Sequence, residues 1–241
     1  MYRQAVRYSY PAPRLVQFDD EDGIILIGSI LNPGFVERLN GENGLRLGVE
    51  TGYSPNDREG RRAALVQFEL LLGILRTHWD DSGELFIEFL GGLGEGSARD
   101  PEGNQYVRPA GVRGRSATEV DSLRAFAEQV SQGLQKSQNL SNAFILFGRA
   151  DRNSADYYMI QEYAEREYGR FGANGVDGVW KKLWITKPEQ DLLKDSANNL
   201  GPLAGGRHVH QKKKIGAPLS LDGQRKYMCT LLTRWVEVSS Q

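Results

Sequence analysis

The spacing of apolar and polar positions predicts strands in the first part of the chain. Apolar residues alternate with polar or small ones over 45–51 and again over 84–90, which is typical of half-buried strands. The segments 14–18 and 23–30 flank an acidic turn that ends in Asp22-Gly23, and β-branched residues follow it. An Asp-Gly step in this setting favours a β-hairpin, so these two segments are predicted to pair.

Elsewhere apolar residues recur three or four positions apart, which predicts amphipathic helices. The first such helix runs from a potential cap at Asn56 to about Trp79. Thr186-Lys187-Pro188-Glu189 has the spacing of a capping box with proline in the first turn, and this marks another helix start. The remaining helical stretches begin near Thr118, cover 143–168 with a break near 148–153, and begin again near Ser220.

Together these elements predict an α+β protein in two domains. The first, over 1–117, is a small mixed β-sheet with one long helix, and it ends in a linker over 91–117 rich in glycine, proline and arginine. The second, over 118–241, is an all-helical bundle made of amphipathic helices joined by short links.

Composition narrows the class of protein. The 241 residues carry a formal net charge of -1, so any site for a polyanion must be a local patch rather than a general basic surface. The longest apolar run, 24–31, is far shorter than the ~20 residues of a membrane-spanning helix, and no membrane partner is expected. Cys229 is the single cysteine, which excludes an internal disulfide and favours a reducing cytoplasm.

One segment near the C-terminus gathers the side chains that can handle a phosphate. Two of the three histidines, His208 and His210, follow Arg207 directly and precede a run of three lysines. Asn198 lies a few residues upstream, at the end of a predicted helix. The candidate catalytic residues are Arg207, His208 and His210, and the candidate substrate-binding residues are Asn198, Lys212, Lys213 and Lys214.

These residue types suit cleavage of RNA without a metal ion or other cofactor. A histidine that titrates near ~6.5 can take or give a proton at neutral pH, an arginine can bind a phosphate with two hydrogen bonds, and lysines attract the backbone. His208 and His210 can also present two imidazoles to zinc, although a third ligand is not evident. The same segment can instead be a surface loop whose charges only keep it hydrated.

The second half of the chain resembles the HEPN superfamily (higher eukaryotes and prokaryotes nucleotide-binding), as it occurs in bacterial defence and toxin systems. The similarity lies in Asp156-Tyr157-Tyr158-Met159-Ile160-Gln161-Glu162-Tyr163, in Ser196-Ala197-Asn198, in Arg207-His208, and in the closing helix that ends in Leu231-Leu232-Thr233-Arg234-Trp235. This resemblance implies a helical bundle that forms a homodimer, with arginine and histidine facing each other across the interface. Active members usually have several residues between the arginine and the histidine, whereas Arg207 and His208 are consecutive in this sequence.

The sequence therefore favours a bacterial RNA-binding or RNA-cleaving module, with an effector in defence as its setting. RNA or a nucleotide is the expected partner, and an endoribonuclease is the expected enzyme class if the protein is an enzyme. The alternative is a non-catalytic protein whose bundle mediates dimer or partner contacts while the first domain senses a ligand.

Overall fold

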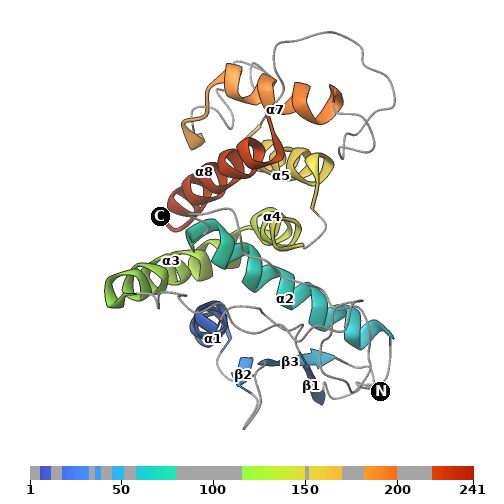
Figure 1. Cartoon of the computed structure of the whole chain (residues 1–241), viewed down its shortest axis with the longest axis vertical. Helices are drawn as coiled ribbons and strands as arrows, with labels where there is room; N and C mark the ends of the chain where they lie inside the picture. Colours follow the sequence, from blue (N-terminus) through green and yellow to red (C-terminus); the bar gives the residue numbers. More distant parts are fainter. Residues whose placement is uncertain are drawn as a thin grey trace, which may run out of the picture.

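The structure is a computed structural model of the chain, and its arrangement is shown in Figure 1. It describes residues 6–11, 18–32, 36–38, 45–51, 58–79, 116–149, 152–169, 182–199 and 219–241. The predicted strand at 84–90 and all but the end of the predicted linker at 91–117 lie outside these residues.

The described strands form a small antiparallel sheet at one end of the molecule. The sheet contains β1 (Val6–Pro11), β2 (Val36–Arg38) and β3 (Leu45–Thr51) in the order β1-β3-β2. The central strand β3 pairs antiparallel with both neighbours, with Val6 opposite Thr51 and Val36 opposite Leu47. The range of β3 is the one that the alternation predicts, but the sheet is antiparallel where a mixed sheet was expected.

Helices make up almost everything else that the structure describes. The first two are α1 (Phe18–Leu31) and α2 (Arg58–Trp79), and α2 follows the predicted 56–79 helix closely. The others are α3 (Ala117–Lys136), α4 (Gln138–Gly148), α5 (Ser154–Tyr168), α7 (Lys187–Asn199) and α8 (Leu221–Ser239). The helices α3, α5, α7 and α8 coincide with predicted helical stretches, whereas α4 begins five residues before the predicted start at 143. The predicted break near 148–153 separates α4 from α5.

The predicted hairpin over 14–18 and 23–30 is wrong, because α1 covers its turn and its second strand, while residues 14–17 lie outside the described residues. Ile24 and Ile27 are fully buried in α1 and lie three residues apart, so they share one face of the helix. A short apolar run is compatible with a buried helix as well as with a strand, and periodicity alone does not separate the two. The packing of α1 against α2 distinguishes the two cases. Gly23 lies so close to α2 that an added Cβ would be 2.6 Å from side-chain atoms of Leu75 and Trp79.

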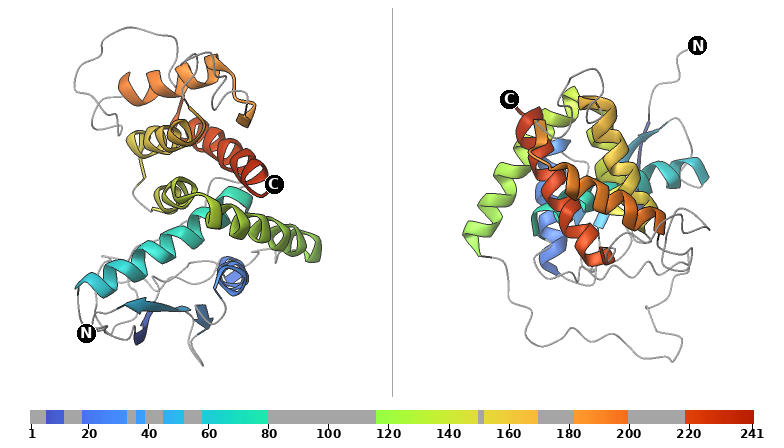
Figure 2. Two further views of the ribbon diagram at one scale, coloured as in Figure 1. Left: turned by 180° about the vertical axis from the view of Figure 1, so that it is seen from behind. Right: turned by 90° about the horizontal axis from the view of Figure 1, so that it is seen from above.

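The largest interface between described elements joins α2 to α4, and in the left view of Figure 2 these helices lie between the sheet and α7 and α8. Glycines allow this approach. A Cβ at Gly73 would lie 2.0 Å from the carbonyl oxygen of Phe144, and one at Gly148 would lie 1.7 Å from that of Glu69. The two backbones therefore touch where any side chain would hold them apart.

Arg76 extends this contact to the C-terminus of α4. Its side chain is buried, and Nη1 donates to the carbonyl oxygens of Gly148 (2.7 Å), Arg149 (3.0 Å) and Phe147 (3.4 Å). The last carbonyls of a helix have no partner within the helix, and they carry partial negative charge. The guanidinium thus satisfies the end of α4 and links it to α2.

The predicted α+β fold class is wrong: the part of the chain that the structure describes is nearly all helical. The long helix expected to cover a sheet contacts β3, but its largest interface is with α4, and it also packs on α8. One apolar core runs without interruption from α1 and α2 into the C-terminal helices, with members such as Phe68, Phe144 and Trp235. The division at residue 117 stays a prediction, while helices from both sides of it share this core.

None of the described helices has the length and apolar character needed to cross a membrane.

Candidate functional site

The predicted phosphate-binding segment connects α7 to α8, and the structure describes the helices on either side of it. The start of α7 shows one half of the predicted capping box, in which the Glu189 side chain reaches back to Thr186. The Glu189 carboxylate accepts hydrogen bonds from the Thr186 backbone N–H (2.8 Å) and from the Thr186 hydroxyl (2.7 Å). The start of α8 is capped by Ser220, whose hydroxyl oxygen accepts from the backbone N–H of Gly223 (3.1 Å). Local sequence therefore fixes where each helix begins.

The two ends of the 200–218 connection are fixed close together. Ser196, in the last turns of α7, accepts a hydrogen bond from the backbone N–H of Leu219 (2.7 Å) and donates to the carbonyl of Leu192 (2.7 Å). Gln224 in α8 donates to the carbonyl of Leu219 (3.0 Å). Ser196 is fully buried, so this anchor is part of the packed interior. The chain thus leaves and re-enters the described fold at one place.

The candidate site residues belong to this connection or to its edge. Asn198 lies in the last turn of α7, and its side chain is outside the described residues. The others are also outside the described residues: Arg207, His208, His210, Lys212, Lys213 and Lys214. A shared phosphate for Arg207 and an imidazole therefore stays a prediction.

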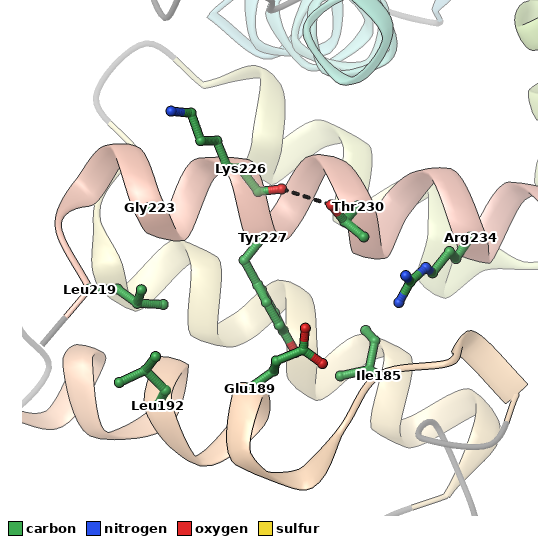
Figure 3. A pocket seen from close by; sticks show the side chains of 9 residues that line it. All are labelled: Ile185, Glu189, Leu192, Leu219, Gly223, Lys226, Tyr227, Thr230 and Arg234. Carbon is green, nitrogen blue, oxygen red and sulfur yellow. Dashed lines mark hydrogen bonds between the residues drawn. The ribbon is translucent and has the colours of Figure 1, made fainter.

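A pocket of about 280 Å³ lies between α7 and α8, which both pack on α5 (Figure 3). Its apolar wall is formed by Ile185, Leu192 and Leu219. Leu219 is also the residue at which the connection rejoins the fold, so the pocket borders the anchor described above. The polar lining consists of side chains from both helices: Glu189 of α7 and Lys226, Tyr227, Thr230 and Arg234 of α8.

The Tyr227 hydroxyl is buried between the two helices. The ring extends from α8 toward α7, and in Figure 3 its hydroxyl end lies beside the Glu189 carboxylate. Burial raises the pKa of this phenol, and the carboxylates of Glu189 and Glu165 raise it further against a smaller opposing effect of Arg234. Within the described structure the buried oxygen has no hydrogen-bond partner. A buried hydroxyl without a hydrogen bond lowers stability. A functional role is one reason why a protein keeps such a group.

The charged groups of the lining are held in different ways. Hydrogen bonds from Thr186 lower the pKa of the Glu189 carboxyl, so this group stays ionised at neutral pH. Lys226 is exposed and pairs with Asp222 at 2.9 Å one turn earlier in α8. The Arg234 guanidinium donates from Nη1 to the carbonyl oxygens of Leu183 (3.4 Å) and Trp184 (2.5 Å). The charged side chains of the lining are thus the Glu189 carboxylate and the Arg234 guanidinium, while the Lys226 ammonium extends away from Glu189 (Figure 3).

Trp184 precedes the pocket-lining Ile185 and is exposed, with 61% of the residue accessible to solvent. Sequence reasoning missed Trp184, Tyr227 and Arg234. Trp184 stands between Leu183 and Ile185, and a run of three apolar residues gives no sign of which one turns outward. Tyr227 and Arg234 read as ordinary members of an amphipathic helix, since their convergence with α7 depends on packing between distant segments.

Among the described residues, no three histidine, cysteine, aspartate or glutamate side chains come together in a group that can hold a metal ion. Cys229 is half-buried and packs against the apolar core, and its thiol lies 3.8 Å from the carbonyl oxygen of Arg76.

Comparison with protein-family models, with curated proteins and with solved structures found no match. The resemblance to the HEPN superfamily therefore stays a prediction that depends on the quoted motifs.

Proposed function

We propose that the α7–α8 region binds single-stranded RNA, with the connection between the two helices as its phosphate-binding and cleaving segment. The observation that carries the proposal is the anchor at Ser196 and Leu219, which ties both ends of the basic connection to the edge of the α7–α8 pocket. The segment that joins these two ends contains one arginine, two histidines and three lysines, and the pocket at its re-entry point has Arg234 in its lining.

The electrostatics favour a local patch rather than a general basic surface. With a net charge of -1, the protein as a whole does not attract polyanions. Lysines gathered in one segment can still bind several successive phosphates and release their counterions. A single strand fits this arrangement because its backbone can follow a short segment while its bases are free to enter a neighbouring pocket.

Cleavage requires groups that the connection supplies. One imidazole of His208 or His210 removes the proton of a ribose 2′-hydroxyl, whose oxygen then attacks the adjacent phosphorus. The other imidazole protonates the departing 5′-oxygen, so the products are a 2′,3′-cyclic phosphate and a free 5′-hydroxyl. Arg207 stabilises the charge on the phosphate oxygens, and Asn198 orients the phosphate. No metal ion is needed for these steps.

The binding test uses a fluorescein-labelled 12-nucleotide single-stranded RNA and follows anisotropy at several salt concentrations. Replacing Lys212, Lys213 and Lys214 by alanine is expected to weaken binding and to reduce the slope of log K against log salt by about 2, because each lost phosphate contact removes roughly 0.7.

The matched control removes three exposed cations elsewhere, by Arg62→Ala, Arg124→Ala and Lys136→Ala on α2 and α3. It changes net charge equally and should leave the slope unchanged. Equal losses in both triple variants would contradict a local site.

The cleavage test incubates the same RNA with the protein and a chelator. Cleavage that survives chelation but disappears in His208→Ala or His210→Ala supports the mechanism, and cleavage that stops on chelation points instead to a metal site at these histidines. Failure to bind RNA, together with a stable dimer in solution, would overturn the proposal in favour of a non-catalytic interaction protein.

A further inference from the structure

Trp184 combines two features that rarely occur together in a bulky residue. Its backbone φ is 49°, in the left-handed region, and 61% of the residue is exposed. Among the described residues, no other non-glycine residue has a positive φ. A side chain with a Cβ adopts this conformation at a cost in free energy, and residues held there cluster at functional sites. Neither burial nor backbone preference accounts for a tryptophan at this position.

The residues around Trp184 hold it in this conformation. Leu183 is fully buried and Ile185 is 4% exposed, so the chain is fixed in the core on both sides while the indole between them turns outward. Arg234 of α8 clamps the same turn, because its Nη1 donates to the carbonyl oxygens of Leu183 and Trp184. The exposed ring is therefore presented by a rigid turn and not by a loose loop.

The turn that carries Trp184 adjoins the α7–α8 pocket through its neighbouring residue and through its clamp. Ile185, the next residue, forms part of the pocket wall, and Arg234 lines the same cavity (Figure 3). The exposed Lys182 lies two residues before Trp184, and the exposed Lys187 three residues after it. An exposed aromatic ring with cations nearby is the arrangement that binds single-stranded nucleic acids, where bases stack on the ring and phosphates meet the cations.

We propose that Trp184 stacks on a base of bound single-stranded RNA and that Arg234 is the positioning residue that holds its turn. This inference rests on the proposed function and adds a base-binding element to it. A protein partner fits the observations less well. Within the described ranges, the other exposed large apolar residues lie on separate helices and not beside Trp184 in one segment: Leu65, Met159 and Leu221.

The test compares a 12-nucleotide RNA with an abasic oligonucleotide of the same length and charge. In the native protein, RNA should bind more tightly than the abasic strand and should quench tryptophan fluorescence, because a stacked base quenches an indole. Trp184→Leu should weaken RNA binding roughly tenfold and abolish most of the quenching. It should leave the salt slope and the affinity for the abasic strand unchanged.

Two further changes at the same position separate stacking from structural damage. Trp184→Tyr keeps an aromatic ring and should restore a large part of the affinity. Trp184→Gly suits the positive φ, so its melting temperature should equal or exceed that of the native protein even though RNA binding falls. Met159→Ala, at another exposed apolar residue on α5, is the matched control and should change neither binding nor quenching.

Arg234 is tested by Arg234→Gln, which removes the guanidinium that clamps the turn. Quenching and RNA affinity should fall together, and Arg234→Lys should restore both in part because its ammonium can still donate to a carbonyl.

If the native protein binds RNA with normal salt dependence but Trp184→Leu binds equally well and no quenching occurs, the inference is overturned and the proposed function stands. If the native protein binds neither RNA nor the abasic strand, both are overturned.

Discussion

At the scale of single residues, two buried polar side chains differ in whether they find hydrogen-bond partners. Arg76 is almost completely buried, and its Nη1 donates to carbonyl oxygens at the end of α4. Tyr227 has a buried oxygen to which the described structure offers no hydrogen bond. Arg76 contributes to the fold, because the carbonyl oxygens that carry partial negative charge lie next to its guanidinium. The Tyr227 hydroxyl lowers the free energy of unfolding, so a substitution that removes it can stabilise the fold.

Tyr227→Phe removes this unsatisfied oxygen and keeps the ring. We expect the free energy of unfolding to stay the same or to rise by up to about 1–2 kcal/mol, since the desolvation cost of the hydroxyl disappears. Urea denaturation followed by circular dichroism measures the change. Tyr168→Phe is the matched control, because the Tyr168 hydroxyl lies 3.1 Å from the hydroxyl of Ser239 and its loss should destabilise the fold. A large loss of stability in Tyr227→Phe would contradict this interpretation of the pocket.

Buried tyrosines also predict how stability changes in alkaline solution. Burial raises the pKa of Tyr157, Tyr168 and Tyr227 above the ordinary value of about 10. Above that pH the unfolded chain loses these protons while the folded chain keeps them, so the folded state binds more protons and stability falls as pH rises. Denaturation midpoints measured from pH 8 to 11 should decrease above about pH 10, and less steeply in Tyr227→Phe. Midpoints that rise above pH 10 would contradict the upward direction of these pKa shifts.

At the scale of elements, the molecule depends on the crossing of α2 and α4. The crossing is possible because Gly73 and Gly148 leave no side chain between the two backbones. Arg76 then reaches the carbonyls of the last turn of α4. In a sequence these glycines read as weak points of their helices, since glycine lowers helix propensity. In the structure they are the points of closest contact.

Gly148→Ala should be strongly destabilising, by about 3 kcal/mol or more, because its Cβ would lie 1.7 Å from the carbonyl oxygen of Glu69 and backbone cannot move aside cheaply. Gly223→Ala in α8 is the matched control. Its Cβ would meet no heavy atom closer than 3.3 Å, and helix propensity favours alanine by up to about 1 kcal/mol. Thermal unfolding of both variants tests the difference, and similar melting temperatures would show that α2 and α4 do not cross as described.

At the scale of the whole molecule, the core joins segments on both sides of the predicted boundary at residue 117. The buried apolar residues of α2 belong to the same cluster as those of α4 and α8. Figure 1 shows the helices as successive layers, with the strands at one end and α7 at the other. The layers on the two sides of the boundary therefore share apolar surface that either part alone would expose.

A fragment covering 116–241 tests whether the second half folds alone. Because α4 would lose its cover by α2, we expect the fragment to bind a hydrophobic dye and to unfold without the sharp transition of the full chain. Differential scanning calorimetry of both proteins measures this. A fragment with a cooperative transition and no dye binding would support two independent domains, as the sequence predicts.

The sequence by itself determined the positions of most helices and several of their ends, since caps such as Thr186 with Glu189 and Ser220 with Gly223 act between residues three apart. It also identified a segment rich in phosphate-binding side chains. It misassigned α1, because a short apolar run is compatible with either a strand or a buried helix until its neighbours are known. Only the tertiary structure decided that α2 packs on α4, that Trp184 turns outward between two buried residues, and that Tyr227 meets α7 in a pocket. These features depend on contacts between residues far apart in the chain, and local patterns carry no information about such contacts.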